Sequence, residues 1–194
     1  MEGEGEFTWL IDPLDGTINY FHGYPAFAIS IALKERGEIT LGAVYDPLRD
    51  EFFYAQKEQR ATLNDKRVRV STTHRLIFSL LATGFPYQRA LIPDNNVREF
   101  SRLVTRVQGI RRGGSAALDL AYVAAGRLDG YWEMHLSPWD WAAGGLLVEE
   151  AGGVVTDLEG GAWIPFKKGI VATNGRIHEE LISELRAAAD PVRR

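Results

Sequence analysis

A short apolar segment that runs into two aspartates is the feature that most constrains the fold of this chain. Residues 7–11 read Phe-Thr-Trp-Leu-Ile, and Asp12 and Asp15 follow directly, on either side of a proline. The proline fixes its own φ angle, and Gly16 allows the backbone to turn sharply. We therefore expect a strand followed by a rigid turn that directs both carboxylates at one point.

The chemistry of this turn has two interpretations. The carboxylates of Asp12 and Asp15 and the carbonyl of Leu14 are hard oxygen ligands. They suit Mg²⁺, which takes few carboxylates and keeps waters for an anionic substrate. An ordinary turn is the alternative, because Asp, Pro and Gly dominate turns in any protein. The segment alone leaves both interpretations open.

A second acidic segment lies far along the chain. Glu133 lies near the end of a predicted strand, and Asp140 precedes an Ala- and Leu-rich stretch that stops at Gly152-Gly153. This order predicts a helix that starts near Asp140 and ends at the glycine pair. Taken alone, Asp140 is most simply an N-cap or first-turn acid that stabilises this helix.

Taken together, the two segments resemble both signature motifs of the inositol monophosphatase family of Mg²⁺-dependent, lithium-sensitive sugar phosphatases. Residues 12–17 (Asp-Pro-Leu-Asp-Gly-Thr) resemble the first motif, and Trp139-Asp140 with its helix resembles the second. Residues 113–121 resemble the start of the family's substrate-side helix. The resemblance covers essentially the whole chain and is closest to the bacterial members. It implies an α/β (α+β) fold, a layered α-β-α-β-α sandwich of the sugar-phosphatase type.

The resemblance also implies roles for individual residues. Two to three Mg²⁺ ions are expected, held by Asp12, the Leu14 carbonyl, Asp15 and Asp140. Thr17 and Asp15 are implied in catalysis, with Thr17 orienting the attacking water. For Glu133 an ordinary acid at a strand end is the alternative. Residues implied in substrate binding are Gly16, Thr17, Gly114, Ser115, Ala116, Glu133 and Asp140. Arg111-Arg112 has two interpretations, a phosphate contact or a partly solvated strand edge.

The start of the chain departs from the family pattern. Family members carry two helices, a β-hairpin with a mobile loop and a Gly-Glu-Glu segment ahead of the first motif. One glutamate of that segment helps to activate the attacking water. Here only Met-Glu-Gly-Glu-Gly-Glu precedes Phe7. We therefore expect an N-terminally truncated family domain with poor catalytic activity on its own, and we expect Glu2, Glu4 and Glu6 to belong to a solvated loop.

The pattern of apolar and turn residues predicts one domain, residues 1–194, with two parts. An antiparallel sheet that carries the first motif is expected over about 1–77, and alternating strands and helices with the second motif over about 78–194. In the first part, the predicted strands after the motif are 26–33, 39–46, 51–55 and 68–70. In the second part, the predicted helices are 96–107, 116–125, the one that follows Asp140, and 177–188; the predicted strands are 110–112, 128–134, 154–157 and 170–173.

Composition excludes several classes of protein. A formal net charge of −4 argues against a general nucleic-acid binder, which carries a basic patch. The absence of cysteine excludes disulfides, zinc–thiolate sites and a thiol nucleophile. The longest apolar run, residues 26–33, is far too short to cross a membrane. Because the first residues are not those of a signal peptide, we predict a soluble, cytoplasmic protein.

The resemblance implies hydrolysis of myo-inositol 1-phosphate to myo-inositol and phosphate by a metal-activated water. Fructose-1,6-bisphosphatase, histidinol-phosphatase and nucleotide 3′-phosphatase activities occur on the same scaffold and stay open as alternatives. A non-enzymatic role is the alternative from another class, because some bacterial relatives bind the transcription machinery. The resemblance further implies a homodimer, in line with the two-fold symmetry of most soluble oligomers.

Overall fold

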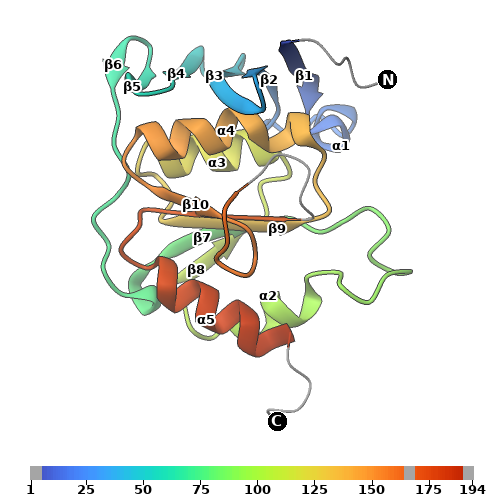
Figure 1. Cartoon of the computed structure of the whole chain (residues 1–194). Coiled ribbons are helices and arrows are strands. Elements are labelled where there is room, and N and C mark those ends of the chain that lie inside the picture. Colours follow the sequence, from blue (N-terminus) through green and yellow to red (C-terminus); the bar gives the residue numbers. More distant parts are fainter. Residues whose placement is uncertain (1–5, 164–168, 190–194) are drawn as a thin grey trace.

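The layered α+β sandwich expected from the sequence is confirmed. The computed structural model describes residues 6–163 and 169–189. Figure 1 shows four layers in these ranges: a first sheet, a pair of helices, a second sheet and another pair of helices. The inner pair is α3 (Ala116–Ala124) and α4 (Pro138–Glu150). The outer pair is α2 (Val97–Leu103) and α5 (His178–Ala189).

The first sheet is an antiparallel meander of six strands in the order β1-β2-β3-β4-β5-β6. Its strands are β1 (Phe7–Asp15), β2 (Ala28–Glu35), β3 (Glu38–Asp46), β4 (Glu51–Gln56), β5 (Arg60–Leu63) and β6 (Lys66–Arg67). The predicted strands 26–33, 39–46 and 51–55 are thereby confirmed. The prediction of a strand at 68–70 is wrong, because the chain leaves the sheet there and the Val70 N–H donates to the Ala151 carbonyl on α4's side.

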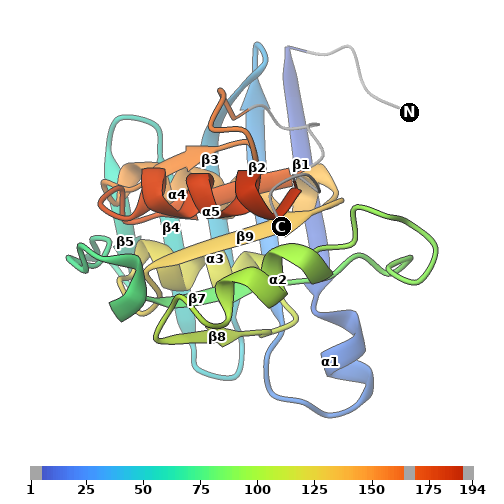
Figure 2. The same ribbon diagram turned by 90° about the horizontal axis from the view of Figure 1, so that it is seen from below.

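Strand β1 does not stop ahead of the first motif. Ile11 pairs with Ile31 and Asp12 with Ser30, and the register then shifts before Asp15 pairs with Ala28. Because of this irregularity, the strand continues through the Asp-Pro-Leu-Asp segment, but Asp12 and Asp15 no longer follow the regular alternation of side chains between the two faces of the sheet. The helix α1 (Thr17–Phe21) follows at once and lies beside the end of β1 (Figure 2).

The second sheet is mixed, in the order β10-β11-β9-β7-β8. Its strands are β7 (Leu80–Thr83), β8 (Gly109–Arg111), β9 (Gly130–Met134), β10 (Val154–Thr156) and β11 (Gly169–Thr173). Strand β7 pairs in parallel with both β8 and β9, whereas β11 pairs antiparallel with β9 and β10. The central position of β9 brings Glu133 to the middle of the sheet, under the inner helices.

Helix α4 packs directly on the first sheet. A Cβ atom at Gly42 of β3 would lie 2.8 Å from the Ala143 carbonyl oxygen and 2.9 Å from its Cα atom. Only a glycine permits this approach of strand to helix backbone. Residues of the first sheet, of both inner helices and of the second sheet share one buried cluster, which includes Phe53, Leu120 and Ile170. The motif-bearing strand and helix are therefore fixed against each other.

The outer face of the first sheet is apolar and exposed. The expected five-layer sandwich has a helical layer there, but in residues 6–163 and 169–189 the layers run β-α-β-α (Figure 1). The side chains on this face include Phe7, Trp9, Ile11, Ile29 and Phe52, of which Trp9 is 56% exposed.

In the described ranges, none of the helices is long and apolar enough to cross a membrane.

Two of the predicted helices differ at their ends. The helix expected over 96–107 begins only at Val97, because Asn96 has a left-handed backbone with a φ angle of 69°, and it ends at Leu103. The chain then turns, which brings Val107 into the second buried cluster. Ser115 caps α3 as predicted, and its hydroxyl accepts from the Leu118 N–H at 3.4 Å. The final helix is confirmed as α5.

Candidate active site

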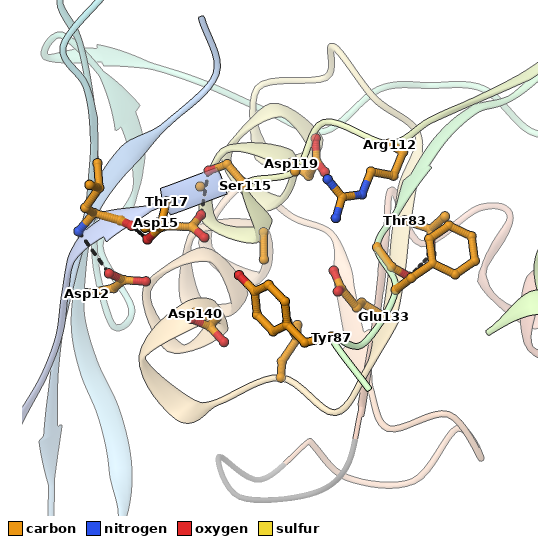
Figure 3. Close-up of a pocket in the computed structure, with 17 residues that line it drawn as sticks. Asp12, Asp15, Thr17, Thr83, Tyr87, Arg112, Ser115, Asp119, Glu133 and Asp140 are labelled. Atoms are coloured by element: carbon orange, nitrogen blue, oxygen red, sulfur yellow. Dashed lines mark hydrogen bonds between the residues drawn. The ribbon is translucent and has the colours of Figure 1, made fainter. Parts of the chain in front are cut away.

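One pocket contains every residue that the sequence predicted for the site. Its volume is about 110 Å³, and Figure 3 shows its side chains. Strand β1 and helix α1 supply one wall, the start of α3 a second, and β9 with the start of α4 a third. The predicted residues in its lining are Asp12, Leu14, Asp15, Gly16, Thr17, Gly114, Ser115, Ala116, Glu133 and Asp140. Segments more than 120 residues apart in sequence therefore meet here.

Three carboxylates gather at one end of this pocket. Each of Asp12, Asp15 and Asp140 offers an oxygen atom, and these atoms lie within 4.8 Å of one another. We call these residues the acidic triad. Asp12 is held by the Leu14 N–H, which donates to its Oδ1 atom at 2.9 Å. The rigid turn predicted from Asp-Pro-Leu-Asp-Gly thus directs its carboxylates at one point.

Asp15 is buried at the N-terminus of α3. Its Oδ2 atom accepts a hydrogen bond from the Ser115 hydroxyl and another from the Ala117 N–H at 2.8 Å. The N-terminus of a helix favours a negative charge, so α3 holds this carboxylate in place. The resemblance implied a substrate contact for the backbone of Gly114-Ser115-Ala116, and no role for the Ser115 side chain. Here its hydroxyl faces Asp15 and the first turn of α3, and its residue still lines the pocket.

Asp140 combines both roles that the sequence left open. It lies in the first turn of α4, where its Oδ2 atom accepts from the Ser137 N–H at 2.8 Å in a capping box. Ser137 is the N-cap, so of the two helix positions considered for Asp140, the N-cap and the first turn, the first turn is the one observed. The same carboxylate completes the acidic triad. Capping fixes the direction of the side chain, which also lines the pocket beside Asp12 and Asp15.

The electrostatics of the triad favour a cation. Burial raises the pKa of Asp15 to about 6, although the hydrogen bond from Ser115 opposes this, and the charge of Asp12 adds to the rise. Burial also raises the pKa of Asp140 to about 7, and the charges of Asp15 and Asp12 add to it. Like charges this close resist joint ionisation, and a divalent cation removes that penalty. Oxygen ligands of this kind fit Mg²⁺.

The first motif is tied to the glycine segment before α3. The Thr17 hydroxyl donates to the Leu14 carbonyl at 2.9 Å, beside the triad. Asn19 is buried, and its Nδ2 atom donates to the Ala26 carbonyl at 2.6 Å and to the Gly113 carbonyl at 2.9 Å. The sequence analysis missed Asn19, because a lone asparagine after the motif carries no signal of its partner 94 residues away. It joins two walls of the pocket.

The other end of the pocket holds Glu133, Asp119 and Arg112. Asp119 lies on α3 with 6% of its surface exposed, and burial raises its pKa well above the ordinary value while Arg112 opposes the shift. Burial raises the pKa of Glu133 to about 7, opposed by a hydrogen bond from Tyr131 and by Arg112. Figure 3 shows the Arg112 side chain directed into this region. Asp119 was missed, since it reads as a helical first-turn acid.

A turn after β7 closes this end. Thr83, Gly84, Phe85 and Tyr87 line the pocket, and none of them was predicted. A Cβ atom at Gly84 would lie 2.1 Å from a carboxylate oxygen of Glu133, so the glycine makes room for that side chain. Of the N-terminal glutamates, Glu6 forms an ion pair with Arg36 in the turn between β2 and β3, whereas Glu2 and Glu4 lie outside the described residues.

Comparison with known proteins identifies the class that this fold and site define. The family model for the inositol monophosphatase family matches residues 1–190. An inositol-1-monophosphatase of Synechocystis sp. is 50% identical over 184 residues, which are 95% of this chain and 64% of that protein. The Nus factor SuhB of Pseudomonas aeruginosa is 47% identical, over 98% of this chain and 72% of that protein.

A solved structure agrees with this assignment. The inositol monophosphatase from Anabaena (Nostoc) superimposes with a TM-score of 0.94 at 50% identity, over 96% of this chain and 74% of that one. The chain belongs to the inositol monophosphatase family, a family of phosphatases. It spans about two thirds of the length of the relatives it matches, 64% of the Synechocystis protein.

Proposed function

We propose that this protein is a Mg²⁺-dependent phosphatase that hydrolyses myo-inositol 1-phosphate to myo-inositol and phosphate. The observation that carries the proposal is the acidic triad at one end of a pocket whose other end holds Glu133 and Asp119. The first end suits a cation and a phosphate, and the second suits groups that donate hydrogen bonds. Family membership and the relatives named inositol-1-monophosphatase support it.

The triad and the Leu14 carbonyl are the groups that would hold two to three Mg²⁺ ions. Bound Mg²⁺ neutralises the charge on a phosphate ester and lowers the pKa of a coordinated water. Thr17 is the hydroxyl beside that end, oriented by its hydrogen bond to Leu14. Gly16, with a φ angle of 88°, places the N–H groups that start α1 at a chain reversal, which suits a phosphate oxygen.

The far end of the pocket supports a monophosphate over a bisphosphate. Its charged groups are the guanidinium of Arg112 and the carboxyls of Asp119 and Glu133. One cation beside two acids leaves no surplus positive charge to hold a second phosphate. The two carboxyls instead suit the hydroxyl groups of a polyol. This favours inositol 1-phosphate over fructose 1,6-bisphosphate, while histidinol phosphate, whose amine is cationic, stays a competitor.

Phosphate release from a panel of esters tests the proposal. The panel is myo-inositol 1-phosphate, fructose 1,6-bisphosphate, histidinol phosphate and a nucleoside 3′-phosphate, each with and without Mg²⁺. We expect the highest kcat/KM with myo-inositol 1-phosphate, and release only when Mg²⁺ is present. A preference for the bisphosphate or the nucleotide would overturn the substrate, and release that is equal without Mg²⁺ would overturn the metal requirement.

A second function is supported by a specific finding, the relatives named Nus factor SuhB. A role with the transcription machinery would be one of protein contacts, and the net charge of −4 does not favour direct nucleic-acid binding. Copurification of RNA polymerase with this protein, compared with an Asp140→Asn variant, separates the two roles. Equal capture by both forms would show that binding is independent of the triad.

By family resemblance we further propose that the protein is a homodimer and that it is cytoplasmic.

A further inference from the structure

The Tyr131 hydroxyl is a buried polar group that is hydrogen-bonded to a residue of the site. Tyr131 lies on β9, two residues before Glu133, so both side chains project from the same face of the sheet. Tyr131 is fully buried, and its hydroxyl donates a hydrogen bond to the Oε2 atom of Glu133. Burying a tyrosine hydroxyl is costly unless it is paired, so this contact is held firmly.

The surroundings of Glu133 fix its carboxylate on two further sides. On one side, Gly84 leaves no room for any side chain between the turn after β7 and the carboxylate, since a Cβ atom there would lie 2.1 Å away. On another side, the positive charge of Arg112 acts on both Glu133 and Asp119. The backbone around Gly84 is itself tied down, because the buried Asn96 donates to the Gly84 carbonyl at 2.6 Å.

We propose that Tyr131 is a positioning residue for substrate recognition: its hydrogen bond holds the Glu133 carboxylate in the direction that accepts hydrogen bonds from the ring hydroxyls of a polyol monophosphate. The inference rests on the proposed function. It assigns Tyr131 no contact with the phosphate, because the acidic triad lies at the opposite end of the pocket (Figure 3). Loss of the Tyr131 hydroxyl therefore weakens binding of the polyol part of the ligand and leaves phosphate binding unchanged.

The test compares two ligands in one protein. Assays of inositol release in Mg²⁺ give the KM for myo-inositol 1-phosphate and the inhibition constant of inorganic phosphate, which report the two affinities, in the unsubstituted protein and in Tyr131→Phe. A hydrogen bond to a charged group contributes roughly tenfold in affinity. We expect about a tenfold loss for myo-inositol 1-phosphate and a change of less than about twofold for phosphate. Equal losses for both ligands, or none for either, would overturn the inference.

Two further variants control for structural damage. Tyr122→Phe removes a hydroxyl that donates to Asp46 at 3.3 Å away from the triad, and we expect it to leave both affinities unchanged. Gly84→Ala forces the Glu133 carboxylate to move and should reproduce the selective loss. Unchanged selectivity in Gly84→Ala would also contradict the inference. If the unsubstituted protein binds neither ligand in Mg²⁺, the proposed function itself fails and the inference falls with it.

Discussion

Replacing Asn96 with alanine is expected to destabilise the protein by about 3 to 5 kcal/mol, a large part of the free energy of unfolding of an ordinary domain. Asn96 is fully buried. Its Nδ2 atom donates to the Thr83 hydroxyl at 2.7 Å and to the Gly84 carbonyl, and its Oδ1 atom accepts from the Trp132 Nε1–H at 2.6 Å. The substitution leaves the Trp132 Nε1–H buried without its partner and leaves the Gly84 carbonyl only a long contact from the Thr83 hydroxyl, at 3.5 Å, which is the costly case.

The backbone adds to this cost. Asn96 has a φ angle of 69°, which asparagine tolerates and alanine adopts only under strain. Urea unfolding of both proteins measures the difference. The matched control is Asn95→Ala, whose side chain bonds the Arg89 carbonyl and the Val97 N–H near the surface. We expect the control to lose about 1 kcal/mol or less. Equal losses for the two variants would contradict a special role for the buried network.

Replacing Asp140 with asparagine is expected to weaken Mg²⁺ binding by about 100-fold or more, because it removes a charged ligand from the acidic triad. Asparagine can still accept the hydrogen bond from the Ser137 N–H, so the cap of α4 is retained. Calorimetric titration of Mg²⁺ into both proteins gives the two affinities. The matched control is Asp50→Asn, in the turn between β3 and β4, whose carboxylate accepts from the Tyr45 hydroxyl and lies outside the triad.

The same substitution should raise the stability of the metal-free protein above about pH 7. The folded-state pKa of Asp140 is raised to about 7, so its ionisation costs stability as the pH rises to that value. Asparagine has no charge and avoids the cost. Melting temperatures at about pH 8 without Mg²⁺ measure the effect. A metal-free Asp140→Asn protein that melts lower than the unsubstituted one, or that keeps its Mg²⁺ affinity, would contradict the role assigned to the triad.

The helices and strands that were predicted correctly are marked by residues within or next to each element. The meander from β2 to β4 follows from apolar runs separated by turn residues, and α3 follows from its cap at Ser115 and its stop at Gly126. Short β5 and β6 were missed, since four and two residues with few apolar side chains give no pattern. Helix α2 ends at Leu103, ahead of the predicted end, although no glycine or proline stands there, and Val107 beyond it packs in the second buried cluster.

The predicted site residues gather because two motifs, recognisable only when they are taken together, are brought close by the packing of α4 on the first sheet. The residues that were missed act through partners distant in sequence. Asn19 donates to the Gly113 carbonyl, and Gly84 makes room for the Glu133 side chain. Such contacts form only when the fold brings distant segments together around the pocket. In the sequence alone, an asparagine or a glycine at these positions has the residue type of an ordinary turn or cap.

The central claim, that the acidic triad is a Mg²⁺ site, is tested most directly by calorimetric titration of Mg²⁺ into the unsubstituted protein. The titration is run at about pH 6.5 in buffers of different ionisation enthalpy, so that protons released on binding are counted. With the pKa of Asp15 raised to about 6 and that of Asp140 to about 7, both groups are partly protonated there. We predict saturable binding with release of protons, and an affinity that rises towards pH 8. No saturable binding, or binding that releases no protons, would contradict the claim.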